Sequence, residues 1–269
     1  MSGNSLSYLG WSGFKFSFPG SAPLFIDPPN DSSLPRDTDI SLLISHGHPE
    51  HISGALGYLR DSSRQGAANV LAPPRMCAYL KRRSRHPHDQ FQPCLPGTAH
   101  NLDGVIVDAF QCHHMPLLPP EKGATVERVK QLIGNVKLAV GIALDVVRGP
   151  LAGPMLGFRL SPPQGSKILF LGEGLHRNIK RENIAEIGAN YNSDIVITAI
   201  EPEDHQVLPD LISATQTAIA IPYEAHMPWR EGFKMPLADI DGLSATLAGI
   251  GMVVIQADKG STTPLPDKD

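Results

Sequence analysis

The chain has 269 residues, of which 41% are hydrophobic and 19% are charged, as expected for a globular protein that buries a core. Its formal net charge of -4 provides no overall positive field that would attract nucleic acid, so no nucleic-acid partner is expected. The three cysteines have no paired spacing, which argues against a disulfide framework and favours a reducing compartment.

The sequence shows neither of the two hydrophobic segments that direct a chain out of the cell or into a bilayer. The N-terminal residues have no basic stretch followed by an apolar stretch, which a secretory signal needs. No uncharged apolar run approaches the roughly 20 residues that span a bilayer. We therefore expect a cytoplasmic protein without a membrane span.

Short apolar runs, several of them alternating with polar residues, predict strands through the first part of the chain. In chain order these strands lie at residues 6–8, 14–18, 24–27, 40–44, 69–71 and 105–109. Helices are predicted at residues 53–60 and 74–83, and the second of them opens with a proline, which the first helical turn tolerates.

Residues 116–154 interrupt this rhythm with apolar residues at helical spacing. We interpret them as a helical insertion that acts as a lid, which would narrow access to a site and favour an apolar substrate. Strands are then predicted at residues 156–160, 168–171, 195–200, 218–221 and 252–255, and helices at 179–187, 210–217 and 237–248. Residues 1–269 are thus expected to form a single α/β domain whose sheets are covered by helices.

The run His46-Gly47-His48-Pro49-Glu50-His51 follows the predicted strand at residues 40–44 directly. Imidazole and carboxylate groups are the ligands that zinc, iron and manganese take from proteins. Three imidazoles this close together would repel one another when charged, so we expect them to share one function. The run therefore predicts a metal site.

Four further candidates, His113, His114, Glu173 and His226, also follow predicted strands. Because strand ends of one sheet lie near one another, residues that are distant in sequence can converge there. For Glu173 the alternative is a helix N-terminal carboxylate, stabilised by the helix dipole. For His226 the alternative is an ordinary surface histidine.

Five blocks of this sequence resemble the metallo-β-lactamase superfamily, and within it the lactonase-like branch typified by L-ascorbate-6-phosphate lactonase. These blocks are residues 8–14 with 25–28, the run at 46–51, Gly172-Glu173, residues 193–197 and residues 221–226. The resemblance spans nearly the whole chain, and it rests on the order and spacing of the blocks. It implies a four-layer αββα sandwich, in which two sheets lie face to face with helices outside.

The resemblance also implies a ligand set for two divalent metal ions, with zinc as the first expectation and manganese or iron as alternatives. The first ion would be held by His46, His48 and His114, the second by Glu50, His51 and His226, and Glu173 would bridge both. We prefer His114 to His113 because the family ligand is the last residue of the matching stretch.

The chain departs from the family pattern at both carboxylate positions, where Glu50 and Glu173 replace aspartates. Each glutamate places its oxygens about 1.5 Å further from the backbone. The backbone must therefore retreat, or the metals must sit differently. Both replacements keep the negative charge, which favours a working site with altered geometry.

The leading hypothesis is a metal-dependent hydrolase in which a hydroxide bridging the two metals cleaves an ester, lactone, amide or phosphodiester bond. Glu50 and Glu173 would act within the metal site, and Asp204 or His205 would supply a proton. A small-molecule substrate would contact His113, Tyr223, Trp229 or Arg230. The alternatives are a non-haem di-iron oxidoreductase on the same fold and a non-catalytic metal-binding protein. The oligomeric state stays open.

Overall fold

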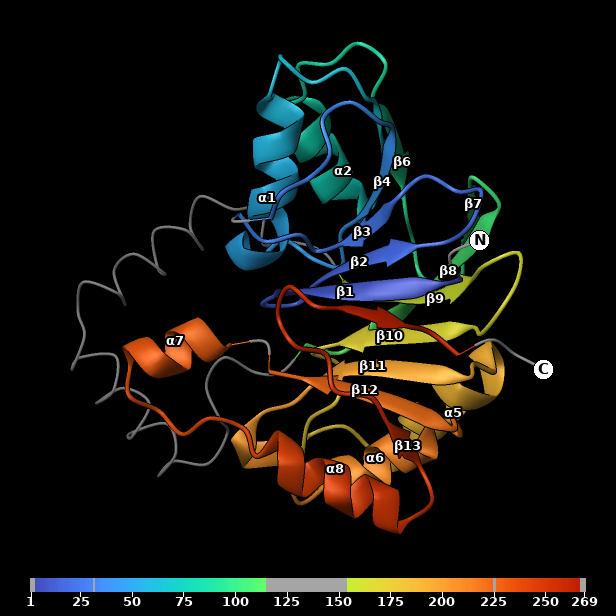
Figure 1. The fold of residues 1–269 in the computed structure, drawn as a ribbon, viewed down its shortest axis with the longest axis vertical. Helices are drawn as coiled ribbons and strands as arrows, with labels where there is room; N and C mark the ends of the chain where they lie inside the picture. The colour runs from blue at the N-terminus through green and yellow to red at the C-terminus, as the bar shows by residue number, and fades with distance from the viewer. Residues whose placement is uncertain (1–2, 31, 115–153, 225, 267–269) are drawn as a thin grey trace.

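The structure is a computed structural model that describes residues 3–30, 32–114, 154–224 and 226–266. The predicted helical insertion at 116–154 lies almost wholly outside the described residues, so its proposed role as a lid stays a prediction. The described strands form two sheets of seven strands each. The residues outside the described ranges are drawn as a thin grey trace in Figure 1.

The first sheet is built mainly from the N-terminal part of the chain. Its order is β14-β1-β2-β3-β4-β5-β6. The strands are β1 (Ser5–Gly10), β2 (Gly13–Ser17), β3 (Leu24–Ile26), β4 (Ile40–Leu43), β5 (Ala68–Ala72), β6 (Gln90–Pro93) and β14 (Thr262–Pro264). Strands β3 to β6 run parallel to one another, so the loops after β3 and β4 leave the same edge of the sheet.

The second sheet is built mainly from the C-terminal part, in the order β13-β12-β11-β10-β9-β8-β7. Its strands are β7 (Ala99–Leu102), β8 (Val105–Cys112), β9 (Met155–Ser161), β10 (Ile168–Gly172), β11 (Ile195–Ala199), β12 (Ile219–Tyr223) and β13 (Val253–Val254). Strands β10 to β13 are parallel, and β7 to β10 pair antiparallel. Glu173, Glu201 and His226 therefore follow neighbouring parallel strands on the same edge.

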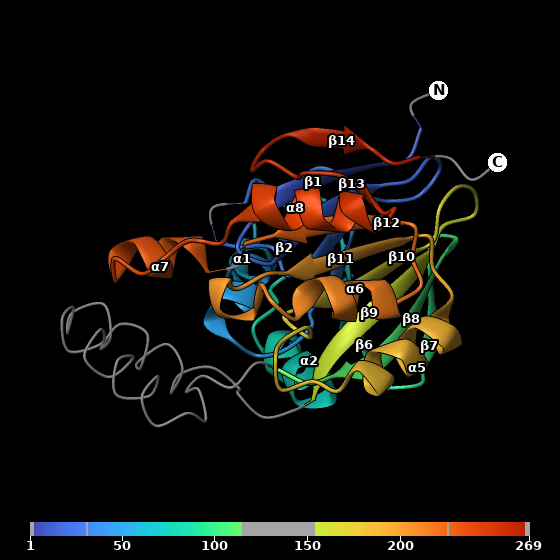
Figure 2. The ribbon, with the colours of Figure 1, turned by 90° about the horizontal axis from the view of Figure 1, so that it is seen from below.

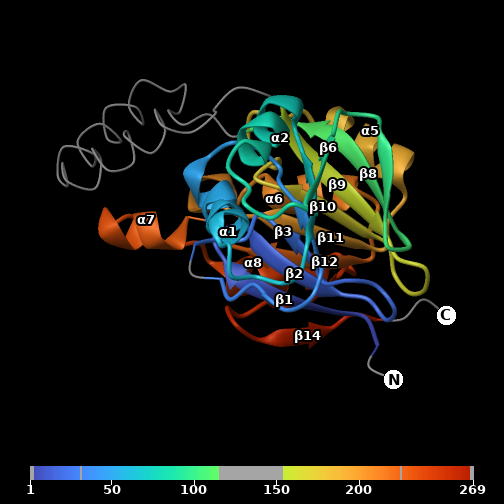
Figure 3. The same ribbon diagram turned by 90° about the horizontal axis from the view of Figure 1, so that it is seen from above.

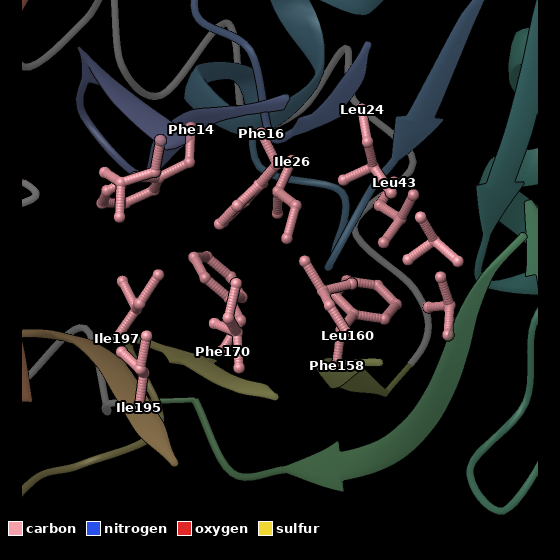
Figure 4. Close-up of a cluster of buried hydrophobic side chains, with 14 of the residues drawn as sticks. Phe14, Phe16, Leu24, Ile26, Leu43, Phe158, Leu160, Phe170, Ile195 and Ile197 are labelled. Carbon is pink, nitrogen blue, oxygen red and sulfur yellow. The ribbon is translucent and has the colours of Figure 1, made fainter. Parts of the chain in front are cut away.

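The main hydrophobic core lies between the two sheets, where alternate side chains of each strand point inward (Figure 4). Ten of its members are Phe14, Phe16, Leu24, Ile26, Leu43, Phe158, Leu160, Phe170, Ile195 and Ile197. Because both sheets contribute large side chains to one layer, this core fixes how the sheets sit on each other and hence where their strand ends meet.

Helices cover the outer faces of both sheets. Figure 3 shows α1 (Pro49–Arg60) and α2 (Pro74–Lys81) over the first sheet, and Figure 2 shows α5 (Arg181–Tyr191), α6 (Leu208–Ala214) and α8 (Ile240–Gly249) over the second. A separate buried apolar cluster underlies each helical layer. The layers therefore follow the order αββα, as the sequence predicts. None of the described helices combines the length and apolar character that crossing a bilayer requires.

Two of the differences from the sequence prediction bear on the site. Helix α1 begins at Pro49, four residues before the predicted start, because proline fits the first helical turn. Glu50 and His51 therefore belong to a helix rather than to a loop. A short helix α7 (Met227–Gly232), which the sequence did not predict, directly follows His226.

Candidate metal centre

Three histidines of the β4–α1 connection converge on one carboxylate from the other half of the chain. Each of His46, His48, His51 and Glu173 offers one donor atom, and these four atoms all lie within 4.8 Å of one another. The connection is tight because β4 ends at Leu43 and α1 already begins at Pro49, with His48 as its N-cap. A short stretch of backbone thus aims three imidazoles at one point.

Glu173 stands at the centre of this group. Strand β10 ends at Gly172, whose φ of 54° turns the chain there, and the Glu173 side chain is 1% exposed. Its Oε1 atom lies 3.2 Å from His51 Nε2 and 3.3 Å from His226 Nε2, and its Oε2 atom lies 3.0 Å from His114 Nε2. The next helix, α5, begins only at Arg181, so Glu173 is not a helix N-terminal carboxylate.

A buried aspartate holds two of the histidines in place. Asp27 follows β3 and accepts hydrogen bonds from the Ser45 backbone N–H at 2.8 Å and from the Ser45 hydroxyl. The Ser45 hydroxyl lies 2.9 Å from His46 Nδ1, and Asp27 Oδ2 lies 2.9 Å from His51 Nδ1. We call Asp27 and Ser45 the Asp27 brace.

A second buried carboxylate holds His226. Glu201 follows β11, and its Oε1 atom lies 2.5 Å from His226 Nδ1. The other Glu201 oxygen is paired with Arg230 of α7, which also binds Glu203 at 2.6 Å. Arg230 is 2% exposed, so this ion pair is buried. We call Glu201 and Arg230 the Glu201 brace.

The two braces give His46, His51 and His226 the same orientation. The Ser45 hydroxyl donates to Asp27, so His46 Nδ1 donates to Ser45, and a carboxylate accepts at Nδ1 of the other two histidines. The Nε2 atoms of His51 and His226 then face Glu173, whereas His46 Nε2 lies 3.1 Å from His48 Nδ1. An outer partner that fixes the tautomer in this way is a regular companion of metal-binding histidines.

Glu50 supplies a direct test of whether the residues suit a cation. The side chain is buried, and among the described residues neither of its carboxylate oxygens has a hydrogen-bond partner. His48 Nδ1 lies 3.7 Å from Oε1, beyond hydrogen-bond distance. Burial raises the pKa of Glu50. A buried carboxylate without a partner is costly, whereas a carboxylate that binds a cation is not, so the donor set fits a divalent metal.

The charge states in the absence of a cation match this interpretation. Burial, with the neighbouring His51, lowers the pKa of His46 well below its usual range, and burial beside His114 lowers that of His48 to about 4. Both are therefore neutral imidazoles at neutral pH, the form that binds metals. Burial opposes ionisation of Glu173, but the adjacent His226 and His51 outweigh it and hold its pKa well below normal.

His51 carries a proton that a cation would displace. Burial lowers its pKa, yet Asp27 and Glu173, which flank its two ring nitrogens, outweigh burial and raise the pKa to about 10. The metal-free site therefore holds a charged imidazole between two carboxylates. Binding of a cation at Nε2 would release this proton.

His113 and His114 have different surroundings. His114 lies against Glu173, and its ring centroid is 4.6 Å from that of His48. The His113 side chain is exposed, and its backbone carbonyl accepts a hydrogen bond from the buried His176 at 3.2 Å. His176 thus ties the end of β8 to the loop after Glu173, which fixes where His114 stands.

The remaining predicted site residues occupy varied positions. Asp204 is buried and accepts from Arg177 at 2.8 Å, whereas His205 is half-buried. Tyr223 is 1% exposed and packs in the core, with its ring centroid 4.9 Å from that of Phe14. The structure therefore buries Tyr223, and it pairs Arg230 with carboxylates, whereas Trp229 is half-buried and stacks on His226.

Comparison with known proteins gives partial matches in sequence. No protein-family model matches the chain. It is 25% identical to a UPF0173 metal-dependent hydrolase of Rubrobacter xylanophilus over 134 residues, which cover 47% of this chain and 52% of the relative. It is 27% identical to a UPF0173 metal-dependent hydrolase of Azorhizobium caulinodans over 118 residues, 40% of this chain and 48% of the relative. The chain spans about half the length of the relatives it matches.

Solved structures match over almost the whole chain. The metallo-β-lactamase fold protein YhfI from Bacillus subtilis has a TM-score of 0.62 at 10% identity, covering 97% of this chain and 99% of its own. The chain has the metallo-β-lactamase fold. An isothiocyanate hydrolase from Delia radicum gut bacteria (TM-score 0.59, 11% identity, 98% and 100% covered) shares it. So does CmlA, a diiron β-hydroxylase from Streptomyces venezuelae (TM-score 0.65, 14% identity, 98% and 55% covered).

Sequence reasoning missed the residues that support the ligands. Asp27 ends one predicted strand and Glu201 directly follows another, so both lie at strand ends as the candidate ligands do. The same strand-end rule could therefore have marked both carboxylates. Ser12 and Ser45 carried no comparable signal, because buried serines that hydrogen-bond to a carboxylate look like any other serine in a sequence.

Proposed function

We propose that this chain is a metal-dependent hydrolase that binds two divalent cations, zinc first among them, at the edge where the strand ends of its two sheets meet. The observation that carries the proposal is that His46, His51 and His226 are each held at Nδ1, and that Nε2 of His51 and Nε2 of His226 face Glu173. The names of the Rubrobacter and Azorhizobium relatives support the same activity.

The two cations would share the donor set along the lines that the resemblance implies. One would be held by His46, His48 and His114, the other by Glu50, His51 and His226, with Glu173 between them. The position of Glu173, with one oxygen beside His114 and the other beside His51 and His226, supports a bridging role. The unpartnered oxygens of Glu50 support its role as a ligand.

Bound divalent cations lower the pKa of a coordinated water toward neutrality and so supply a nucleophile. The side chains of the protein would orient the ligands and supply the proton. The two braces hold the imidazoles so that no reorientation is needed during turnover. For the proton that the leaving group needs, we propose His205 ahead of Asp204, because the Asp204 carboxylate already accepts from Arg177.

The substrate is proposed to be a small molecule with an ester, lactone, amide or phosphodiester bond. His113 is exposed and Trp229 is half-buried, and both stay proposed contact residues. For Tyr223 and Arg230 we propose a supporting role instead, because burial and ion pairing keep their side chains from a ligand.

A second candidate, a di-iron oxidoreductase, is favoured by one feature. Glu50 and Glu173 make the proposed site rich in carboxylates, and iron accepts such ligands readily. CmlA, which its name describes as a diiron β-hydroxylase, has the same fold. Metal identity and oxygen consumption separate the two candidates.

The test strips the protein with a chelator and restores zinc, manganese or ferrous iron separately. Each form is assayed with phenyl acetate, a γ-lactone, an anilide and bis(4-nitrophenyl) phosphate, and oxygen uptake is recorded. We expect metal-dependent hydrolysis without oxygen uptake, lost in Glu173→Gln and retained in His86→Ala, which removes a histidine of the 86–88 loop. Hydrolysis that persists after chelation, or in Glu173→Gln, would refute the proposal.

A further inference from the structure

Both tryptophans of the chain meet beside the metal centre. Trp11 belongs to the turn between β1 and β2, and Trp229 belongs to α7. Their ring centroids lie 5.5 Å apart, with the rings crossed edge to face at 78°. Two segments from opposite ends of the chain thus bring the largest aromatic side chains to one place.

Trp229 faces a proposed metal ligand directly. Its ring is parallel to that of His226 within 4°, at a centroid distance of 5.3 Å. His226 Nε2 points toward Glu173, 3.3 Å from Oε1. The indole therefore flanks the centre at which a substrate bond would be cleaved.

Trp11 is held in an unusual backbone conformation. Its φ is 52°, in the left-handed region that bulky residues rarely adopt. The Tyr8 hydroxyl lies 2.8 Å from the Trp11 carbonyl oxygen, and the next residue, Ser12, donates to Glu173 Oε1 at 3.1 Å. Strained backbone persists where the surrounding structure fixes it, and such strain clusters at functional sites.

Packing of the cores does not account for these two side chains. Both are half-buried, and neither belongs to any of the three apolar clusters of the described residues. The other large aromatic residues of β1 and β2, Tyr8, Phe14 and Phe16, all lie in the core between the sheets. Trp11 lies outside that core, with its ring against that of Trp229.

We infer that Trp11 and Trp229 form an aromatic wall that binds a flat apolar group of the substrate next to the bond to be cleaved. This inference rests on the proposed function and narrows it to esters or lactones that carry an aromatic or conjugated ring. Aromatic faces bind flat rings by stacking or edge contacts, and ligand sites generally combine such faces with a few polar groups.

The test uses benzoate and acetate, which share the carboxylate and differ in the ring. Their dissociation constants are measured by calorimetry on zinc-loaded protein, and tryptophan emission is recorded in parallel, since it reports on this wall alone. We expect benzoate to bind at least about tenfold more tightly than acetate and to change the emission. Trp11→Ala should reduce the preference to below about threefold.

Metal content is measured for every variant, so that failure of the aromatic wall can be told apart from failure of the proposed metal-dependent function. Trp11→Ala removes a ring that packs against Trp229 and is not itself a proposed ligand, so the bound metal should stay. The control is Leu95→Ala, at a 50% exposed residue after β6, which should keep the preference for benzoate over acetate. Bound zinc without a benzoate preference, or a preference that survives in both Trp11→Ala and Trp229→Ala, would overturn the wall. Failure of the wild type to bind zinc would instead refute the proposed function, and the wall with it.

Discussion

The Asp27 brace and the Glu201 brace both orient proposed metal-binding histidines, but they are themselves held in place by different contacts. The Asp27 brace lies within the first half of the chain, where Asp27 follows β3 and Ser45 follows the neighbouring parallel strand β4. The Glu201 brace joins the loop after β11 to Arg230 of the six-residue helix α7. The first brace is thus fixed by the sheet itself, and the second depends on one buried cation. Variants of the Glu201 brace should therefore lose metal affinity and folding stability together. Variants of the Asp27 brace should separate these two effects better, although less cleanly than variants of Glu173 at the centre of the site.

The largest effect is expected at the residue that both braces serve. Glu173→Gln keeps the shape of the side chain but removes the charge that four surrounding polar groups share. Since loss of a supporting residue alone weakens metal binding by about 10–100-fold, loss of this ligand should exceed about 100-fold. Competition with a chromogenic chelator measures it, and wild-type affinity in the variant would contradict the assignment.

Arg230→Met should be the variant that most destabilises the second brace. It leaves Glu201 buried without its cation, and breaking a buried pair in this way costs about 3–5 kcal/mol. Urea unfolding of the metal-free protein measures the loss. The control is Arg181→Met, whose partner Asp210 is exposed, and there the expected cost is below about 1 kcal/mol. Equal losses in both variants would show that Arg230 is not a buried anchor.

Neutralising the two carboxylates compares the braces directly. Asp27→Asn and Glu201→Gln should each weaken zinc binding by about 10–100-fold, because each removes the acceptor that orients an imidazole. Glu201→Gln should in addition lower the free energy of unfolding, because Arg230 then keeps only part of its compensating charge. If zinc affinity is unchanged in either variant, that carboxylate does not orient a ligand.

The pH dependence of the metal-free protein should reveal the proton on His51. Its pKa is raised from 6.5 to about 10 on folding, so the folded state binds this proton more tightly. The resulting stability is fully present below about pH 6.5 and is lost as the pH rises through 10. The difference in unfolding free energy between wild type and His51→Ala should therefore shrink from pH 6 to pH 10. A difference that grows over this range would contradict the charge state.

Local patterns in the sequence predicted most strands and the contiguous part of the site, whereas the αββα order of the layers was predicted from the resemblance to the metallo-β-lactamase superfamily. Short apolar runs marked most strands, and the run at 46–51 marked three imidazoles at once. The start of α1 was predicted too late, because the sequence alone does not distinguish a histidine-rich loop with one proline from the first turn of a helix. Strands β6 and β7 were missed because each has only four residues and no apolar run, and of these eight residues Leu102 alone is buried.

The braces could not be predicted, because they depend on which strand ends become neighbours in space. Nothing in the local sequence around Glu201 says that it meets Arg230 rather than solvent. The same holds for the pair Trp11 and Trp229, which only the stacking of the two sheets brings together. Residue types and strand ends are local properties, whereas pairing between halves of the chain is a property of the fold.

The most direct test of the central claim is the metal content of protein purified without added metal, measured by elemental analysis against protein concentration. We expect about two divalent ions per chain in the wild type and in His86→Ala, and fewer in His46→Ala. A wild-type protein that holds no divalent ion after purification and takes up none from zinc-containing buffer would contradict it.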